Sequence, residues 1–194
     1  MGARFAKWRA VIRITDTLPS PMCVSVNAHA LARYAALCQE QGIVPIVEPE
    51  VLMDGSHTIE RCEDVTSSIL HAVFHALFEQ CVGLERMLLK PNMVIAGKDC
   101  PKKASVEEVA TATLRCLRRH VPVAVPGIVF LSGGQSDVLA TCSSECDQQA
   151  RSAETVEDQF FLRAGASGSR DRSLAWQATE PESRTASVLP PGEM

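Results

Sequence analysis

Four short apolar segments recur at nearly regular intervals along this chain of 194 residues, and stretches with helical spacing separate them. The segments are "KWRAVIRI" (7–14), "IVPIVEPEVL" (43–52), "MLLKPNMVIAG" (87–97) and "GIVFLSGG" (127–134). Strands that alternate with helices predict parallel βα units, here in the order βαβαβαβ. The α/β fold class is therefore expected, either as a doubly wound sheet or as part of a (β/α)₈ barrel.

The intervening stretches carry helix start and stop signals. We predict a first helix over 27–42, in which Asn27 is the N-cap and Gly42 ends the helix. A second helix is predicted over 58–80. The third, over 105–120, begins with a capping box formed by Ser105 and Glu108.

The character of the sequence changes after Ser136. Residues 137–194 are rich in Ser, Gly, Pro and charged residues, and their apolar residues show no sustained period. We expect this tail to be disordered, apart from a short helix over 153–164. The predicted organisation is a partial barrel domain over 1–136 followed by the tail over 137–194.

The overall composition limits the partners and the compartment. The net charge of -4, with cations spread along the chain, argues against general nucleic-acid binding. The eight cysteines include no CxxC motif and most fall singly in apolar stretches, which indicates reduced thiols in a cytoplasmic protein. The longest apolar run is too short and too rich in proline to span a membrane.

Polar side chains interrupt the four apolar segments at corresponding places. The first three segments each hold two polar residues that are two positions apart, so both members are expected on the same side of the sheet. The positions are Lys7 and Arg9, Glu48 and Glu50, Lys90 and Asn92, and Ser132 in the fourth segment. The interval from one segment to the next is about 42 residues. Ends of successive parallel strands converge, and in a barrel they form the active-site face.

These residue types suggest one chemistry. The amine of Lys90, in an apolar wall and close to Lys7 and Arg9, favours its neutral and nucleophilic form. Such an amine attacks a carbonyl group to form a Schiff base, and a semi-buried carboxylate such as Glu48 can move the protons. The glycine-rich turn over 132–134 offers backbone N–H groups to a phosphate. Together they predict a Schiff-base enzyme acting on a phosphorylated carbonyl compound.

Other interpretations of the same residues stay open at this point. A lysine on a strand is commonly a solvated edge residue, and cross-strand Glu–Lys pairs are commonly ordinary ion pairs. His71 and His75 have the spacing of metal ligands, but their apolar neighbours indicate a packing face, so no metal is expected. The "LSGGQ" motif over 131–135 also occurs in ABC-type ATPases, yet the GxxxxGK[ST] loop that these require is absent.

Six segments carry a family resemblance. They are "FAKWRAVIRI" (5–14), "LARYAALCQEQGIVPIVEPEVL" (31–52), "DGSHTIERC" (54–62), "LLKPNMV" (88–94), "TATLRCLRRHVPVAVPGI" (111–128) and "FLSGGQS" (130–136). With these segments in family order from about residue 3 to residue 136, the chain resembles the class I fructose-bisphosphate aldolases of the animal type.

The resemblance implies a (β/α)₈ barrel and the reversible cleavage of fructose 1,6-bisphosphate into dihydroxyacetone phosphate and glyceraldehyde 3-phosphate. It implies no metal or other cofactor, because the iminium is the electron sink, and it implies a homotetramer. By motif position, the resemblance gives roles to Lys90 as the Schiff-base lysine, Glu48 as the proton carrier, Glu50 and Lys7 as its supporting pair, Arg9 as a substrate-binding residue, and Ser132, Gly133 and Gly134 as the phosphate-binding loop.

The resemblance covers only the central part of the family. A complete barrel needs about 250 residues, and the family's first three strands, its last strand, the aspartate for carbon–carbon cleavage and the terminal tyrosine have no counterpart here. We therefore expect a truncated or variant chain that folds poorly alone and has little activity. The alternatives are a non-catalytic remnant that binds other proteins and a different Schiff-base lyase on a similar barrel.

Overall fold

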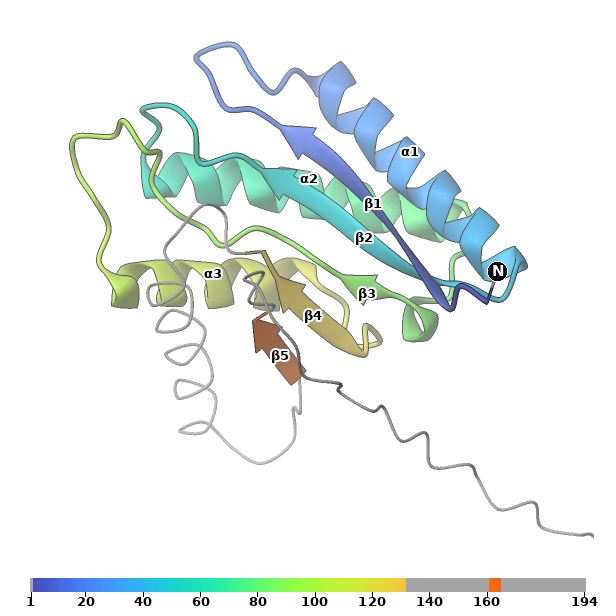
Figure 1. Ribbon diagram of the computed structural model, residues 1–194. Coiled ribbons are helices and arrows are strands. Elements are labelled where there is room, and N and C mark those ends of the chain that lie inside the picture. The colour runs from blue at the N-terminus through green and yellow to red at the C-terminus, as the bar shows by residue number, and fades with distance from the viewer. Residues whose placement is uncertain (1, 132–160, 165–194) are drawn as a thin grey trace, which may run out of the picture.

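Three helices form one layer against a parallel sheet in the computed structural model, which describes residues 2–131 and the backbone of residues 161–164. The helices are α1 (Pro21–Glu40), α2 (Ile59–Glu79) and α3 (Val106–His120). Contacts join α1 to α2 and α2 to α3, so the helices cover the same face of the sheet (Figure 1). A doubly wound sheet would carry helices on both faces.

The sheet follows chain order and is parallel throughout. Its strands are β1 (Phe5–Ile12), β2 (Val44–Val51), β3 (Leu88–Leu89), β4 (Gly127–Phe130) and β5 (Phe161–Ala164). Sequential parallel strands with every helix outside are the arrangement of a (β/α)₈ barrel. The expected α/β class and partial barrel are confirmed, and the doubly wound alternative is wrong.

The third strand is much shorter than the predicted segment 87–97. Its pairing with β2 covers Leu88 and Leu89, and a last backbone bond runs from the Lys90 N–H to the carbonyl of Val47 at 2.8 Å. Pro91 follows and has no N–H to donate, so the ladder stops there. A turn of 3₁₀-helix over Leu84–Arg86 precedes the strand.

The first helix begins earlier than predicted. Its N-cap is Ser20, whose Oγ accepts from the Cys23 N–H at 3.2 Å, and Pro21 occupies the first turn. Asn27 lies inside the helix and donates its side-chain amide to the Cys23 carbonyl. The Ser-Pro pair is the stronger start signal, because proline suits the first helical turn. The predicted end is correct, since Gly42 follows with a φ of 67°.

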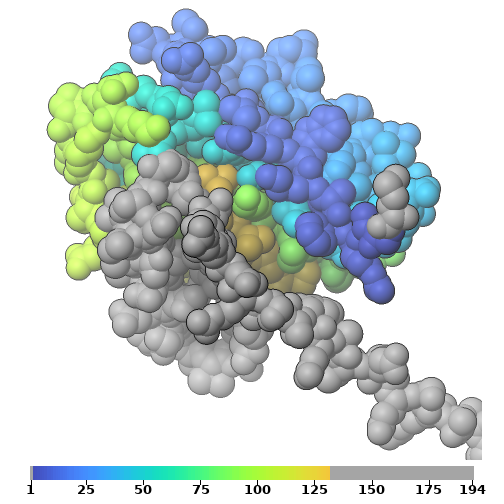
Figure 2. Space-filling model, viewed as in Figure 1, coloured from blue at the N-terminus to red at the C-terminus, as the bar shows by residue number. Residues whose placement is uncertain are grey.

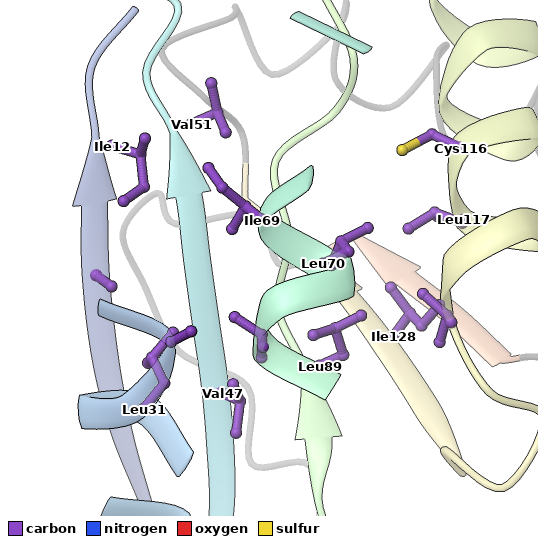
Figure 3. Packing of buried hydrophobic residues seen from close by; sticks show 14 of the residues in the cluster. Ile12, Leu31, Val47, Val51, Ile69, Leu70, Leu89, Cys116, Leu117 and Ile128 are labelled. Atoms are coloured by element: carbon purple, nitrogen blue, oxygen red, sulfur yellow. The ribbon is translucent and has the colours of Figure 1, made fainter. Parts of the chain in front are cut away.

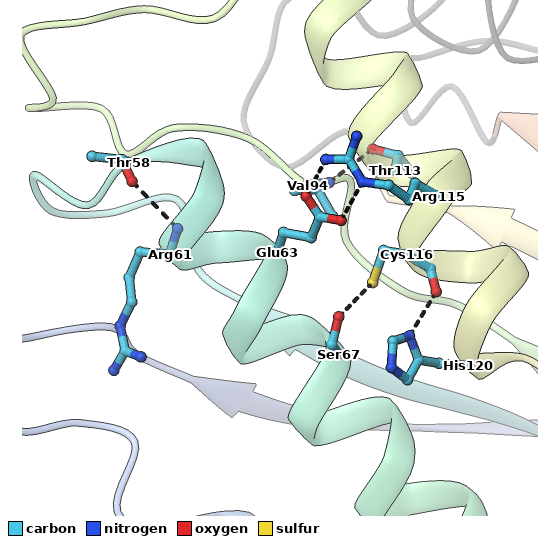
Figure 4. Close-up of polar contacts among 9 residues, drawn as sticks. All are labelled: Thr58, Arg61, Glu63, Ser67, Val94, Thr113, Arg115, Cys116 and His120. Atoms are coloured by element: carbon cyan, nitrogen blue, oxygen red, sulfur yellow. Dashed lines mark hydrogen bonds and ion pairs between the residues drawn. The ribbon is translucent and has the colours of Figure 1, made fainter.

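The other two helices agree with their sequence signals. Thr58 caps α2 by accepting from the Arg61 N–H at 3.3 Å (Figure 4). Ser105 and Glu108 form the predicted capping box at the start of α3, with bonds of 3.2 and 2.8 Å. Both helices therefore start where local side-chain chemistry satisfies free N–H groups.

The described part of the tail is a strand and not a helix. Residues 161–164 form β5 and pair in parallel with β4, which contradicts the end of the short helix predicted over 153–164. A tertiary contact thus overrides a weak local signal. The rest of the tail and the expected boundary after residue 136 lie outside the described residues.

The hydrophobic core fills the space between the helix layer and the sheet (Figure 3). The strands β1 to β4 each turn one side toward the helices, as period-two alternation requires. Burial of one such aliphatic side chain contributes about 1.5–3 kcal/mol. Labelled members of this cluster in Figure 3 include Val47, Leu89 and Ile128 from the strands and Leu31, Leu70 and Leu117 from the helices.

Strand β1 lies at the edge of the described sheet. Within the described residues β1 pairs only with β2. Phe5 and Val11 are 64% and 46% exposed. The dark-blue N-terminal segment, which includes β1, lies at the surface in Figure 2.

None of the described helices is both long and apolar enough to span a membrane. The six cysteines in this part of the chain are free thiols.

Candidate active site

One glutamate joins two lysines from different strands. Glu48 lies on β2, Lys7 on β1, and Lys90 directly after β3. Glu48 Oε1 is 3.2 Å from Lys90 Nζ, and Glu48 Oε2 is 3.1 Å from Lys7 Nζ. The three side chains predicted to converge are therefore together on the side of the sheet opposite the helices.

Burial differs sharply within this group. Glu48 is 3% exposed, whereas the side chains of Lys90 and Lys7 are 26% and 46% exposed. Glu48 Oε2 lies at ion-pair distance from Lys7 but accepts no well-directed hydrogen bond. A buried carboxylate oxygen without a directed donor keeps a lone pair available for a proton. Glu48 is thus placed to exchange protons with a group bound at Lys90.

A second ion pair continues the row along the same strands. The Arg9 Nε contacts Glu50 Oε2, and Glu50 is 7% exposed. The resemblance implied Glu50 and Lys7 as a pair that supports the lysine. The structure places Lys7 against Glu48 and Glu50 against Arg9. Two cations on β1 therefore pair with two carboxylates on β2, and one of these carboxylates, Glu48, also contacts the Lys90 amine.

Of the other predicted residues, Asn92 is described and does not join this group. Ser132, Gly133 and Gly134 lie outside the described residues. Asn92 was expected on the same side as Lys90, but its side chain contacts the Val51 backbone and Thr66 of α2 instead. The alternation of a strand does not continue past Pro91, because pairing has stopped by then.

The loop after β2 is fastened to the segment after β3. Backbone N–H groups of Gly97, Lys98 and Asp99 donate to carbonyl groups in the loop 52–58, over 2.8, 2.7 and 2.9 Å. The acceptors are the carbonyls of His57, Met53 and Gly55. The two segments follow β2 and β3, so these bonds join the carboxyl ends of the two strands near Glu48 and Lys90.

His57 in this loop was not singled out by its sequence. Its ring is buried, 9% exposed, and neither ring nitrogen has a hydrogen-bond partner. Burial lowers the pKa of His57, and the nearby Arg61 guanidinium lowers it further. The folded chain therefore favours the neutral form of this imidazole.

The histidines with metal-ligand spacing lie on the outer surface. His71 and His75 are exposed on α2, and His75 Nε2 is 3.4 Å from Glu79 Oε1. Among the described residues, no group of three or more His, Cys, Asp or Glu side chains could hold a metal ion. A groove of about 520 Å³ between α1 and α2 is lined by His29, Arg61 and Asp64, among others, but by no member of the Lys90 group.

Comparison with known proteins identifies the family. A model of class-I fructose-bisphosphate aldolase matches residues 1–155. A probable fructose-bisphosphate aldolase class 1 of Xanthomonas axonopodis pv. citri is 62% identical over 141 residues, covering 73% of this chain and 42% of the relative. Fructose-bisphosphate aldolase C-A of Danio rerio is 59% identical, with 72% and 38% covered.

The fold agrees with a solved relative. Fructose-bisphosphate aldolase of Plasmodium falciparum, solved in a ternary complex with TRAP and a small-molecule inhibitor, is 46% identical. The TM-score is 0.78, with 84% of this chain and 47% of that chain covered. The matched part spans about two fifths of the curated relatives' length. On the family model, the relatives and the shared fold, this chain belongs to the class I fructose-bisphosphate aldolase family.

Proposed function

We propose that the chain performs the Schiff-base chemistry of fructose 1,6-bisphosphate cleavage, with Lys90 as the nucleophile. The observation that carries the proposal is the position of Glu48, whose two oxygens lie 3.2 and 3.1 Å from Lys90 Nζ and Lys7 Nζ. An amine beside a buried proton carrier is what carbinolamine formation and dehydration require. The reaction belongs to glycolysis.

The covalent step begins with the neutral amine. Lys90 Nζ adds to the C2 carbonyl carbon of the open-chain sugar, the nitrogen loses a proton, and the oxygen becomes a hydroxyl group. That hydroxyl group takes a proton and leaves as water, which gives the protonated imine. Glu48, as a buried carboxylate within reach of Nζ, accepts the first proton and returns it to the leaving oxygen.

Cleavage then uses the imine as the electron acceptor. The C4 hydroxyl group loses its proton to a base, the C3–C4 bond breaks, and its electron pair passes into the iminium to form an enamine. Glyceraldehyde 3-phosphate leaves. The enamine takes a proton at C3, and water hydrolyses the imine to release dihydroxyacetone phosphate and the amine. No metal or other cofactor takes part in this scheme.

The cationic residues have separate proposed roles. Lys7, on the far side of Glu48, holds that carboxylate in place through their ion pair. Arg9 and the glycine-rich loop over 132–134 bind the phosphate groups, for which guanidinium and backbone N–H donors are suited. Glu50 holds Arg9 in place through their ion pair.

The six free thiols of the described residues support a setting in the cytoplasm.

A trapping experiment tests the proposal. The purified chain is incubated with dihydroxyacetone phosphate, the imine is reduced with borohydride, and the digested protein is analysed by mass spectrometry. The expected result is a secondary amine on Lys90, absent from Lys90→Ala. The matched control is Lys98→Ala, since Lys98 pairs with Asp54 at the surface outside the Lys90 group. It should retain the adduct.

The outcomes are distinct. Folded protein without an adduct, or equal labelling of Lys90 and Lys98, contradicts Schiff-base chemistry and favours a non-catalytic role. Dihydroxyacetone without its phosphate should label Lys90 more slowly, because the phosphate contacts are lost. Assembly into a homotetramer stays a separate prediction, which the mass of the protein in solution would check.

A further inference from the structure

The amide side chain of Asn92 replaces backbone pairing where the ladder between β2 and β3 has ended. Its Oδ1 accepts from the Val51 N–H at 3.0 Å, and its Nδ2 donates to Thr66 Oγ1 at 3.2 Å and to the Met93 carbonyl at 3.0 Å. Asn92 is 4% exposed. The two backbone partners determine the amide orientation, because Val51 can only donate and Met93 can only accept.

These contacts lie close to the two proposed reacting groups. Val51 is three positions after Glu48 on β2, and Asn92 is two positions after Lys90. The last ladder bond, from the Lys90 N–H to the Val47 carbonyl, joins β2 to the segment after β3 on one side of the Lys90–Glu48 contact. The Asn92–Val51 bond holds them on the other side. The Lys90–Glu48 contact therefore lies between two hydrogen bonds that join the same two segments.

The tie to α2 adds orientation. Thr66 is buried at 3% exposure, and its hydroxyl oxygen receives one of the Asn92 N–H groups. The amide plane is thereby fixed by three partners from β2, α2 and its own segment. A fully satisfied buried amide costs little to keep, whereas removal leaves buried polar groups without partners.

We propose that Asn92 is a positioning residue, which holds Lys90 Nζ at its distance from Glu48 by tying Val51 to the segment after Lys90. This inference rests on the proposed role of the Lys90–Glu48 pair. Displacement of a nucleophile by about 1 Å lowers a rate by up to about a hundredfold. Loss of this tie should therefore affect the imine step more than it affects folding.

The test compares Asn92→Ala with a control that removes a similar buried bond. Thr113 Oγ1, from α3, accepts from the Val94 N–H at 2.9 Å (Figure 4), and Thr113 is 1% exposed. Thr113→Val thus cuts a tie to the same segment, but farther from Lys90. We expect borohydride trapping at saturating dihydroxyacetone phosphate to slow about tenfold in Asn92→Ala and less than about twofold in Thr113→Val.

A second measurement needs no substrate. Lys90 is labelled with a small acylating reagent, and its rate is read by mass spectrometry between pH 6 and pH 9. We expect Lys90 labelling to rise several-fold in Asn92→Ala relative to Thr113→Val, since the amine leaves its contact with Glu48. Hydrogen exchange at the Val51 amide should rise in the same variant. A loss of global stability alone would raise labelling equally in both variants.

The two proposals can fail separately. Failure of the wild-type chain to form an adduct overturns the proposed function, while the labelling of Lys90 still decides the role of Asn92. Equal labelling rates in Asn92→Ala and Thr113→Val overturn the positioning role, even if the wild-type chain traps substrate at Lys90.

Discussion

Gly97 lies so close to Gly55 that a Cβ atom on Gly97 would be 2.1 Å from the Gly55 carbonyl oxygen. Backbone cannot move aside as a flexible side chain can. Gly97→Ala should therefore lower the free energy of unfolding by about 3 kcal/mol. Urea unfolding followed by circular dichroism measures the change.

Gly127 offers the matched control for that substitution. A Cβ there would meet Leu88 Cδ2 at 2.9 Å, and this methyl group ends a side chain that can turn. We expect Gly127→Ala to cost about 1 kcal/mol. Equal costs for the two variants would argue against close backbone contact between the loop 52–58 and Gly97.

Glu48→Gln should separate proton transfer from the shape of the site. The amide fits the same space but carries no charge and accepts no proton on its nitrogen. We expect the rate of adduct trapping on Lys90 to fall about a hundredfold. Glu63→Gln, a change on the helix layer, should leave the rate unchanged. Trapping at the wild-type rate in Glu48→Gln would assign the proton transfer to another group.

The ion pair between Glu63 and Arg115 should contribute to stability in a pH-dependent way. The hydrogen bond from Arg115 lowers the pKa of Glu63 below its ordinary 4.5 (Figure 4). A lowered folded-state pKa stabilises above the unfolded value and loses that effect as pH falls through the folded value. Since the Arg115 side chain is 45% exposed, we expect only about 0.5 kcal/mol.

Chemical unfolding at two pH values tests this pair. The wild-type chain should exceed Glu63→Gln in stability at pH 7, and the difference should be smaller at pH 3. An equal difference at the two pH values would mean that Glu63 acts through packing and not through its charge.

His57 should make the chain less stable in mild acid. Burial and Arg61 lower its pKa in the folded state below the ordinary 6.5, so the unfolded chain binds more protons as pH falls past that value. The stabilisation is complete above pH 6.5 and is lost as pH falls through the folded-state pKa. His57→Leu should flatten the dependence of the urea midpoint between pH 7.5 and pH 5.5. His71→Leu, at an exposed position, should not change that dependence.

Local signals predicted the helices well, because capping depends on neighbours in sequence. The Ser105–Glu108 box appears where expected, and α2 begins next to the predicted start at Thr58. The start of α1 was missed because Asn27 has the right side chain for a cap. Ser20 followed by Pro21 has the right side chain and also the right backbone.

The sequence predicted which residues come together at the candidate site, but it did not predict which of them contact each other. Equal spacing placed Lys7, Glu48 and Lys90 together, since each βα unit returns the chain to the same level. The choice of partners depends on how far side chains reach. Lys7 and Arg9 each contact a glutamate two positions beyond their opposite residue on β2. Such diagonal contacts within a sheet follow from the register, which the sequence does not state.

The contacts of Asn92 and the burial of His57 could not be predicted from the sequence, because both depend on segments that are distant along the chain. Asn92 was read as the second member of a strand pair, and only the end of pairing at Leu89 shows otherwise. His57 lies in a segment that resembles an ordinary polar loop. Its burial depends on the bonds between that loop and residues 97–99, which are distant in sequence.

The segment from Lys90 to Gly97 is hydrogen-bonded at both of its ends. Lys90 is bonded to β2 at one end, and Gly97 is bonded to the loop after β2 at the other. A segment anchored at both ends cannot swing about one hinge, so it moves only together with β2 and its loop. The Lys90 backbone therefore moves with the neighbouring βα unit, although the strand before it pairs with β2 over only two residues.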